Sequence, residues 1–211
     1  MDKRPKTKQP AKKPALQWLI KALPWILIVC GIVGILASLM ITQEKFDLAA
    51  NPHYQPACDL NPIVSCGSVM QSPQANAFGF TNPYIGLIGF PIVLTIGVAM
   101  LAGAKFKRWF WVGLQIGLSL GLVFAYWLLY ESVYSINALC PYCLSVDVVL
   151  TIAVWYTTLY NFRQGHLKVR ASCQKAVDFA SRHHLDIIVL WFLIVIAIIL
   201  KHFWYYYGQH I

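Results

Sequence analysis

The sequence has 211 residues, of which 58% are hydrophobic and only 12% are charged, and its formal net charge is +9. A soluble domain carries about twice that charged fraction, so the composition excludes an ordinary soluble fold. The positive charge does not indicate a nucleic-acid partner, because most of the Lys and Arg residues lie in segments that separate long apolar runs.

Five apolar runs follow a short basic segment at the N-terminus. Residues 1–17 are rich in Lys and Pro and contain too few apolar residues to fold, so we expect a disordered tail. The runs cover residues 18–41, 84–102, 109–130, 143–160 and 187–207, and each is about as long as a helix that crosses a bilayer. The sequence therefore predicts an all-α integral membrane protein.

The basic residues also predict the orientation of the chain. They gather in the tail, in the connection after the second run and in the connection formed by residues 161–186. These segments share one side of the membrane if successive runs cross it in opposite directions. Because cytoplasmic segments carry an excess of Lys and Arg, we expect a cytoplasmic N-terminus, and we expect residues 187–211 to form a fifth helix with an outer C-terminus. The first run is too long for the core of a cleaved signal, and cleavage near residue 50 would not change this sidedness.

The longest segment between runs, residues 42–83, lies on the outer side in this topology. It combines Asn-Pro pairs with apolar residues such as Val64, Val69 and Met70, which predicts a loop with a short helix at the membrane surface. Loops of this length are usually functional.

In the third run, Gly113, Gly117 and Gly121 recur at every fourth position. Small residues at this spacing let membrane helices approach each other closely. We therefore expect this stripe to pack against a neighbouring helix.

The predicted topology divides the six cysteines into two groups. Cys30 lies within the first run and Cys173 lies in a cytoplasmic connection, where a free thiol is the ordinary state. The other four all fall on the outer side, and they are Cys58, Cys66, Cys140 and Cys143. Paired thiols in an oxidising compartment tend to form disulfides.

The Cys140-Pro-Tyr-Cys143 motif stands at the start of the fourth run. Three interpretations fit the motif alone: a static disulfide, half of a zinc site, or a redox centre. We expect the N-terminus of the fourth helix to stabilise a thiolate on Cys143. For Cys58 and Cys66, a structural disulfide and an electron-carrying pair both remain open.

Three stretches together resemble the bacterial branch of the vitamin K epoxide reductase family. They are CDLNPIVSCGSVMQS from residue 58, FGFTNPYIGLIGFP from residue 78 and ALCPYC from residue 138. The similarity extends over residues 18–160, and it implies a four-helix catalytic core that binds a quinone, with residues 42–83 as its outer loop.

The resemblance assigns a role to each outer cysteine. It implies that Cys143 contacts the quinone and that Cys140 is its resolving partner. Cys66 would exchange with Cys140 through a transient disulfide, and Cys58 would meet the external substrate.

The resemblance also implies the residues around the quinone. Asn82 matches an asparagine that donates a hydrogen bond to a quinone carbonyl, and Ser72 and Phe78 match positions near the loop helix that caps the pocket. Vertebrate members carry a tyrosine where this chain has Asp147, which argues against vitamin K epoxide as the substrate. A carboxylate within a membrane is a functional candidate. Proton transfer to the quinone and pairing with a nearby polar group both remain open for Asp147.

The function that follows from the resemblance is a membrane thiol oxidase of the bacterial inner membrane, with its active site facing the periplasm. It would form disulfide bonds in partner proteins and pass the electrons to ubiquinone or menaquinone. Some bacterial relatives continue from the fifth helix into a thioredoxin-like domain, whereas this sequence ends in YYYGQHI. We therefore expect a separate periplasmic thioredoxin-fold protein to supply the dithiol.

One alternative belongs to another functional class, and a second is an enzyme family with the same chemistry. A non-catalytic transporter or receptor subunit, braced by outer disulfides, would carry polar residues through several spans, but these spans offer little beyond Gln115 and Asp147. An unrelated family of four-helix, quinone-linked disulfide oxidases has its redox C-x-x-C motif in the first outer loop. Here the motif follows the third run.

Overall fold

The computed structural model describes residues 14–51, 53–167 and 174–207. Its helical elements are α1 (Pro14–Ala50), α2 (Cys66–Gln71), the 3₁₀ turn η1 (Pro73–Asn76), α3 (Pro83–Leu101), α4 (Arg108–Glu131), the π-helical turn η2 (Ser132–Ile136), α5 (Pro141–Gln164), α6 (Gln174–Arg182) and α7 (His184–Tyr207). Most of the predicted disordered tail, residues 1–13, lies outside the described residues, as does Cys173.

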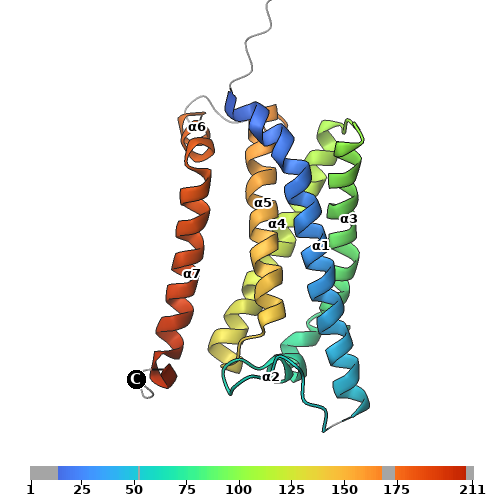
Figure 1. Cartoon of the computed structure of the whole chain (residues 1–211), viewed down its shortest axis with the longest axis vertical. Coiled ribbons are helices and arrows are strands. Elements are labelled where there is room, and N and C mark those ends of the chain that lie inside the picture. The colour runs from blue at the N-terminus through green and yellow to red at the C-terminus, as the bar shows by residue number, and fades with distance from the viewer. Residues whose placement is uncertain (1–13, 52, 168–173, 208–211) are drawn as a thin grey trace, which may run out of the picture.

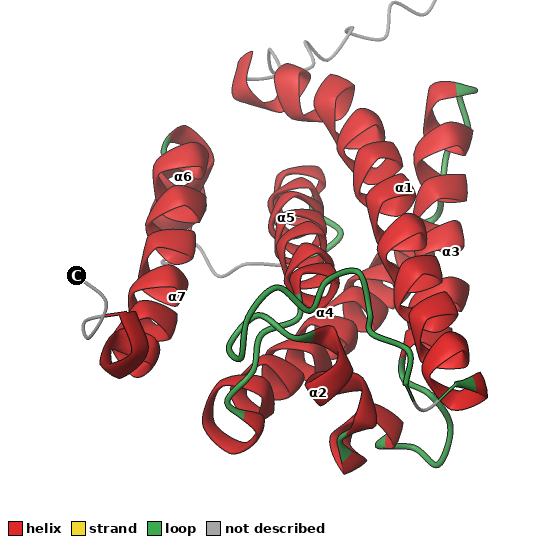
Figure 2. Cartoon of the chain, turned by 60° about the horizontal axis from the view of Figure 1, so that its bottom comes forward, coloured by secondary structure: helices red, strands yellow, loops and turns green. Residues whose placement is uncertain are grey.

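Four long helices, α1, α3, α4 and α5, form a bundle, and α7 stands beside it (Figure 1). Helix α1 packs against both α3 and α5, and α4 packs against α5. The loop after α1 and the short helix α2 lie across one end of the bundle (Figure 2). We call this end the cysteine end.

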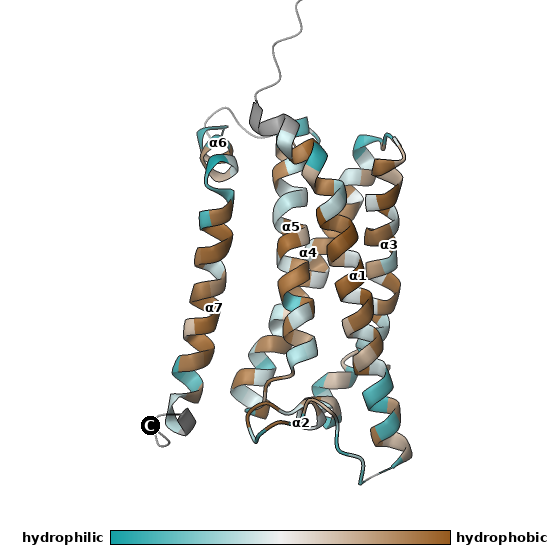
Figure 3. Cartoon of the chain, in the orientation of Figure 1, coloured by the Kyte–Doolittle hydropathy of each residue, from teal (hydrophilic) through white to brown (hydrophobic). Residues whose placement is uncertain are grey.

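Five helices are long and apolar enough to cross a membrane. Their middle sections are hydrophobic and their ends are more hydrophilic (Figure 3). This arrangement confirms the predicted all-α membrane fold, with a four-helix bundle, a fifth membrane helix and an outer loop that contains a short helix.

Helix α1 continues beyond residue 41, where its apolar run ends, as far as Ala50. The residues after the run include Gln43, Glu44 and Lys45, which favour helix, and a helix breaker first occurs at Asn51. The outer loop is consequently shorter than residues 42–83. The extra turns of α1 support this loop, because Lys45 Nζ donates a hydrogen bond of 2.8 Å to Asn76 Oδ1 in η1.

Glycines do allow close helix packing, but not at the predicted stripe. A Cβ atom at Gly113 or Gly117 would meet nothing within 4 Å among the described residues. The close approach lies between α1 and α3 instead, where a Cβ atom at Gly31 would come within 2.7 Å of Leu94 Cβ, and one at Gly97 within 2.8 Å of the Pro24 carbonyl oxygen. The three glycines do share one helix face, but this face borders a cavity, and only at Gly121 would a Cβ atom reach a neighbouring helix, 3.8 Å from Leu150 Cδ2 among the described residues.

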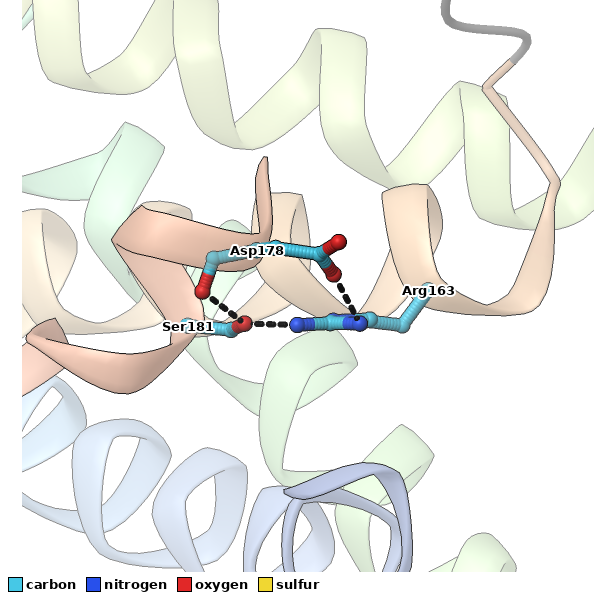
Figure 4. Close-up of polar contacts among 3 residues, drawn as sticks. All are labelled: Arg163, Asp178 and Ser181. Carbon is cyan, nitrogen blue, oxygen red and sulfur yellow. Dashed lines mark hydrogen bonds and ion pairs between the residues drawn. The ribbon is translucent and has the colours of Figure 1, made fainter. Parts of the chain in front are cut away.

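The basic connections gather at the end of the bundle opposite the cysteine end (Figure 1). Arg108 Nε donates to the His166 carbonyl oxygen at 2.6 Å, which joins the start of α4 to the end of α5. Arg163 on α5 forms an ion pair of 2.7 Å with Asp178 and also donates to Ser181 Oγ, so α6 is attached to α5 (Figure 4).

Helix α7 touches the bundle at a few points along its length. Near its start, His184 Nδ1 lies 3.1 Å from the Tyr156 hydroxyl, and further along Trp191 Nε1 donates to the Tyr126 hydroxyl at 2.6 Å. An apolar cavity of about 560 Å³ separates the first half of α7 from α4 and α5. Among the side chains of α7 that the structure describes, Ile188 and, near the cysteine end, Phe203 are buried.

Candidate active site

Two chain segments that are distant in the sequence meet at the cysteine end. Val64 and Leu139 form a single parallel β-bridge. The Ser65 N–H donates to the Leu139 carbonyl oxygen at 3.1 Å, and the Leu139 N–H donates to the Ile63 carbonyl oxygen at 2.6 Å. Cys140 directly follows Leu139 and Cys66 is two positions after Val64, so the backbone itself brings the two cysteines together.

The sulfur atoms are buried in one apolar group at this position. Its fully buried members are Ile41, Cys58, Cys66, Met70 and Cys140, and Leu48, Val69, Tyr142 and Cys143 pack against them. We call this group the sulfur cluster. Cys66 and Cys140 are 0% and 1% exposed, so bulk water does not reach either side chain. All four cysteines that the topology assigned to the outer side thus belong to one site.

Cys58 and Cys66 form a disulfide with a Cα–Cα distance of 5.7 Å. The turn between them is held by side chains rather than by the sulfurs alone. Asn61 Oδ1 accepts hydrogen bonds from the Ile63 and Val64 N–H groups, and Asp59 Oδ1 accepts one from the Gly67 N–H at 2.9 Å. Asn and Asp side chains commonly fix loops by such local bonds. Cys58 and Cys66 therefore form a closed disulfide, and hydrogen bonds that do not involve sulfur also hold the backbone around it.

Cys140 and Cys143 are free thiols, and Cys140 is the N-cap of α5. The helix begins at Pro141, a residue that favours the first helical position. As a result, Cys140 Sγ accepts a hydrogen bond of 3.4 Å from the Cys143 backbone N–H. The sequence led us to expect that the N-terminus of this helix acts on the Cys143 sulfur. In the structure, the sulfur atom that accepts a hydrogen bond from the first turn of α5 is that of Cys140.

The hydrogen bond from the Cys143 thiol lowers the pKa of the Cys140 thiol below its ordinary value, and backbone N–H groups of α5 act in the same direction. Burial opposes this shift but does not cancel it. Among the described residues, no group of three or more His, Cys, Asp or Glu side chains is placed to hold a metal ion.

A cavity of about 560 Å³ lies inside the bundle beneath the sulfur cluster, bounded by α1, α3, α4 and α5. Its lining is mostly apolar, and its volume falls in the range of sites for small organic molecules. The polar residues that line it are Ser38, Lys45, Ser72, Gln74, Asn82, Ser132, Cys140, Cys143 and Asp147. The glycine stripe of α4 forms part of its wall.

Asp147 lies one helical turn after Cys143 and lines the same cavity. It is 8% exposed, and its carboxylate forms no hydrogen bond or ion pair with the described residues. Its backbone carbonyl accepts a hydrogen bond of 2.7 Å from the Thr151 hydroxyl. A buried carboxylate without a structural partner, facing a cavity, favours a functional interpretation over simple pairing.

Asn82 and Ser72 line the cavity where the outer loop enters the bundle. Asn82 Nδ2 donates to the Gln74 carbonyl oxygen at 2.7 Å, and its Oδ1 accepts from the Ala77 N–H at 3.1 Å. Ser72 Oγ donates to the Val69 carbonyl oxygen at the end of α2. Both side chains therefore hold the loop in place as well as bordering the cavity.

Phe78 lies apart from these residues. Its side chain is 59% exposed and it does not line the cavity. The centroid of its ring lies 5.1 Å from the ring centroid of Phe124, and Phe124 does line the cavity.

Sequence reasoning assigned no role to Lys45, Gln74 or Glu131 at this site. Lys45 reaches from α1 to the η1 turn, and Gln74 Nε2 donates to Glu131 Oε2 at the end of α4, with an N–O distance of 3.2 Å. Lys45 is the single Lys or Arg residue between the first two apolar runs, and this isolated charge could have identified it as a candidate for a role in the site.

The comparison with family models adds an independent finding. The model of the vitamin K epoxide reductase family matches residues 25–158, from within α1 to within α5. The matched segment includes all four cysteines of the sulfur cluster, together with Asn82 and Asp147. A search of curated proteins with this sequence found no match. The match covers more than half of the chain, and the chain belongs to the vitamin K epoxide reductase family.

Proposed function

We propose that the protein is a membrane thiol oxidase that forms disulfide bonds in periplasmic thioredoxin-fold proteins and delivers the electrons to a membrane quinone, either ubiquinone or menaquinone. Family membership makes the chain a membrane oxidoreductase of a quinone-linked family. The observation that carries the finer proposal is the bridge between Val64 and Leu139, which sets the loop disulfide beside the C-x-x-C motif at the mouth of an apolar cavity.

The first two steps are thiol–disulfide exchanges. A partner thiolate attacks Cys58 of the Cys58–Cys66 disulfide, and the partner then leaves as a disulfide while both loop sulfurs become thiols. The Cys66 thiolate next attacks Cys140 of a Cys140–Cys143 disulfide. Cys58 resolves the mixed disulfide, so the loop disulfide closes again and the inner pair is reduced. The closed loop pair beside free inner thiols corresponds to the state after this transfer.

The cavity fits a quinone ring, because it is largely apolar and places its few polar side chains next to the inner thiols. Cys143 and Asp147 on one side and Asn82 on the other would hold the ring. When bound, the quinone supplies an acceptor for two electrons and two protons. Re-formation of the Cys140–Cys143 bond releases these electrons and protons, and Asp147 would carry a proton at its carboxylate. Asn82 would donate a hydrogen bond, and Ser72 would help to close the cavity, with Phe78 outside it.

Electrons should flow from thiols toward the quinone, because respiratory quinones are stronger oxidants than most protein disulfides. The orientation is part of the proposal. The basic connections lie at the end opposite the sulfur cluster, which supports a cytoplasmic basic end and a periplasmic cysteine end in a bacterial inner membrane.

The alternative of a transporter gains no support from the polar residues within the spans. Gln115 donates to Thr158 at 2.9 Å and accepts from Asn161 at 3.1 Å, so this group ties α4 to α5. Asn161 is fully buried. These contacts fasten helices together and do not line a path across the bundle.

The proposal is tested with purified protein, a quinone and a reduced thioredoxin-fold protein, by following the loss of substrate thiols and the formation of quinol together. Cys66→Ala and Cys140→Ala should each abolish both signals, whereas Cys30→Ala, a buried cysteine within α1, should retain them. Absence of substrate oxidation by the protein with all its cysteines would refute the proposal.

A further inference from the structure

The last turns of α7 meet the two segments that carry Cys66 and Cys140. Phe203 is 1% exposed and packs in a buried group with Ile63, Val133 and Leu139. Two of these residues, Ile63 and Leu139, are joined by the 2.6 Å hydrogen bond that holds the outer loop against the segment before α5. The Phe203 ring thus covers the junction of the two cysteine-bearing segments.

A second contact from α7 reaches the turn that leads to Cys140. His202 Nε2 lies 3.0 Å from Asn137 Oδ1. Asn137 has a φ angle of 58° and is the only residue other than glycine with a positive φ in the described chain. This conformation turns the chain out of η2 and into Leu139 and Cys140. His202 therefore contacts the residue whose backbone fixes the direction of the segment.

The neighbours of Phe203 on α7 show that this burial is specific. Trp204 is 64% exposed and Leu200 is 52% exposed. A helix that served only as an anchor would expose its apolar side chains to lipid on all sides. The Phe203 ring is instead buried against the bundle, next to the segments that carry Cys66 and Cys140.

We propose that Phe203 and His202 are positioning residues that hold Cys140 in register with Cys66 for the internal disulfide exchange. This inference rests on the proposed function, because it assigns a role in the transfer between the two pairs. The fifth membrane helix is then a part of the catalytic apparatus that acts through the bridge, although it contributes no reacting group.

The exchange can be isolated in a Cys143→Ala variant, in which Cys140 has no inner partner. The Cys140 thiolate attacks Cys66, the Cys66–Cys140 bond forms and the Cys58–Cys66 bond breaks. The released electron pair remains on the Cys58 sulfur, which takes up a proton, so no oxidant is needed. The equilibrium ratio of the two disulfides reports how well Cys140 is placed beside Cys66.

The experiment measures this ratio by acid quenching, alkylation of free thiols and peptide mass spectrometry, with Cys30 and Cys173 replaced by Ala. Adding Phe203→Ala should lower the Cys66–Cys140 fraction by about tenfold, since small misplacements of reacting groups have large effects. Phe203→Leu should restore most of the ratio, and His202→Ala should lower it less. If Phe203→Ala does not fold, His202→Ala carries the test, because its ratio should still fall below that of the parent.

Two matched controls separate positioning from general loosening of α7. Trp204→Ala removes an exposed aromatic ring from the next position, and Ile188→Ala removes the other buried side chain of α7, far from the cysteine end. Both should leave the ratio unchanged. The inference is overturned if Phe203→Ala also leaves the ratio unchanged, if His202→Ala does so where Phe203→Ala does not fold, or if Ile188→Ala lowers the ratio equally. Failure of the Cys143→Ala parent to form any Cys66–Cys140 bond would instead refute the proposed function.

Discussion

Cys140 is the N-cap of α5, a buried member of the sulfur cluster and the residue that directly follows the bridge. The same backbone that brings its sulfur to Cys66 also supplies N–H groups that favour a thiolate. The Cys143 thiol and the start of α5 therefore act together to stabilise negative charge on the Cys140 sulfur, the atom that the proposed exchange with Cys66 releases as a thiolate.

The effect of Cys143 on Cys140 gives a prediction about pH. The Cys143 thiol donates a hydrogen bond that lowers the pKa of Cys140, so its removal should raise that pKa. In Cys143→Ala, the thiolate of Cys140 should consequently form at higher pH than in the unaltered reduced protein. Titration of the ultraviolet thiolate absorbance checks this, with Cys30→Ala as the control. A midpoint that stays the same or falls would contradict the assignment.

Asp147 provides a second prediction for a single residue. Asp147→Asn keeps the size of the side chain but cannot take up a proton, so re-formation of the inner disulfide on addition of quinone should slow by on the order of a hundredfold. Reduction of the loop disulfide by the partner should keep its rate. Stopped-flow measurement of the two half-reactions separates these effects. Equal rates in Asp147→Asn and the unaltered protein would show that the carboxylate carries no proton.

Among the elements, the contact between α1 and α3 depends on glycine, whereas Gly113 and Gly117 of α4 face open space. Gly31→Ala should destabilise the bundle by about 1–3 kcal/mol, because the added methyl group meets Leu94. Gly117→Ala should not destabilise it, since its added methyl group meets nothing within 4 Å. Thermal unfolding in detergent compares the two variants directly. Similar losses of stability in both would place a helix contact at Gly117 after all.

Some features of these elements could be predicted from the sequence, and others depended on contacts between distant segments. The five spans follow from hydropathy, because a bilayer requires long apolar runs. Hydropathy places the end of α1 too early, because the apolar run stops at Ile41 while helix-favouring residues continue as far as Ala50. Pro141 did mark the start of α5 and could have identified Cys140 as the N-cap.

The stripe at Gly113 and the burial of Phe203 show the limit of local patterns. Spacing defines which residues share a helix face, but it does not state what that face meets. Phe203 stands in an aromatic stretch typical of a membrane boundary, so nothing in the sequence distinguishes it from the exposed Trp204. The four cysteines could be grouped in advance because topology alone puts them on one side.

At the scale of the whole molecule, the orientation in the membrane can be tested with one exposed residue from each end. Leu60 is 74% exposed in the outer loop, and Lys105 is exposed in the connection between α3 and α4. In a variant without native cysteines, Leu60→Cys should react with an impermeant maleimide in intact spheroplasts. Lys105→Cys should react only after lysis. The reverse pattern would invert the proposed topology.

The hydrogen bonds of the bridge and of the Asn61 turn use backbone and amide groups, and none of them involves a sulfur atom. We therefore expect Cys66 to keep its position when the Cys58–Cys66 bond opens. Under the proposed function, the loop would act as a stationary relay rather than a swinging arm, and only the bonds between sulfur atoms would change from step to step. The exposed part of the loop around Leu60 would then be free to vary with the partner protein while the transfer between the two cysteine pairs stays the same.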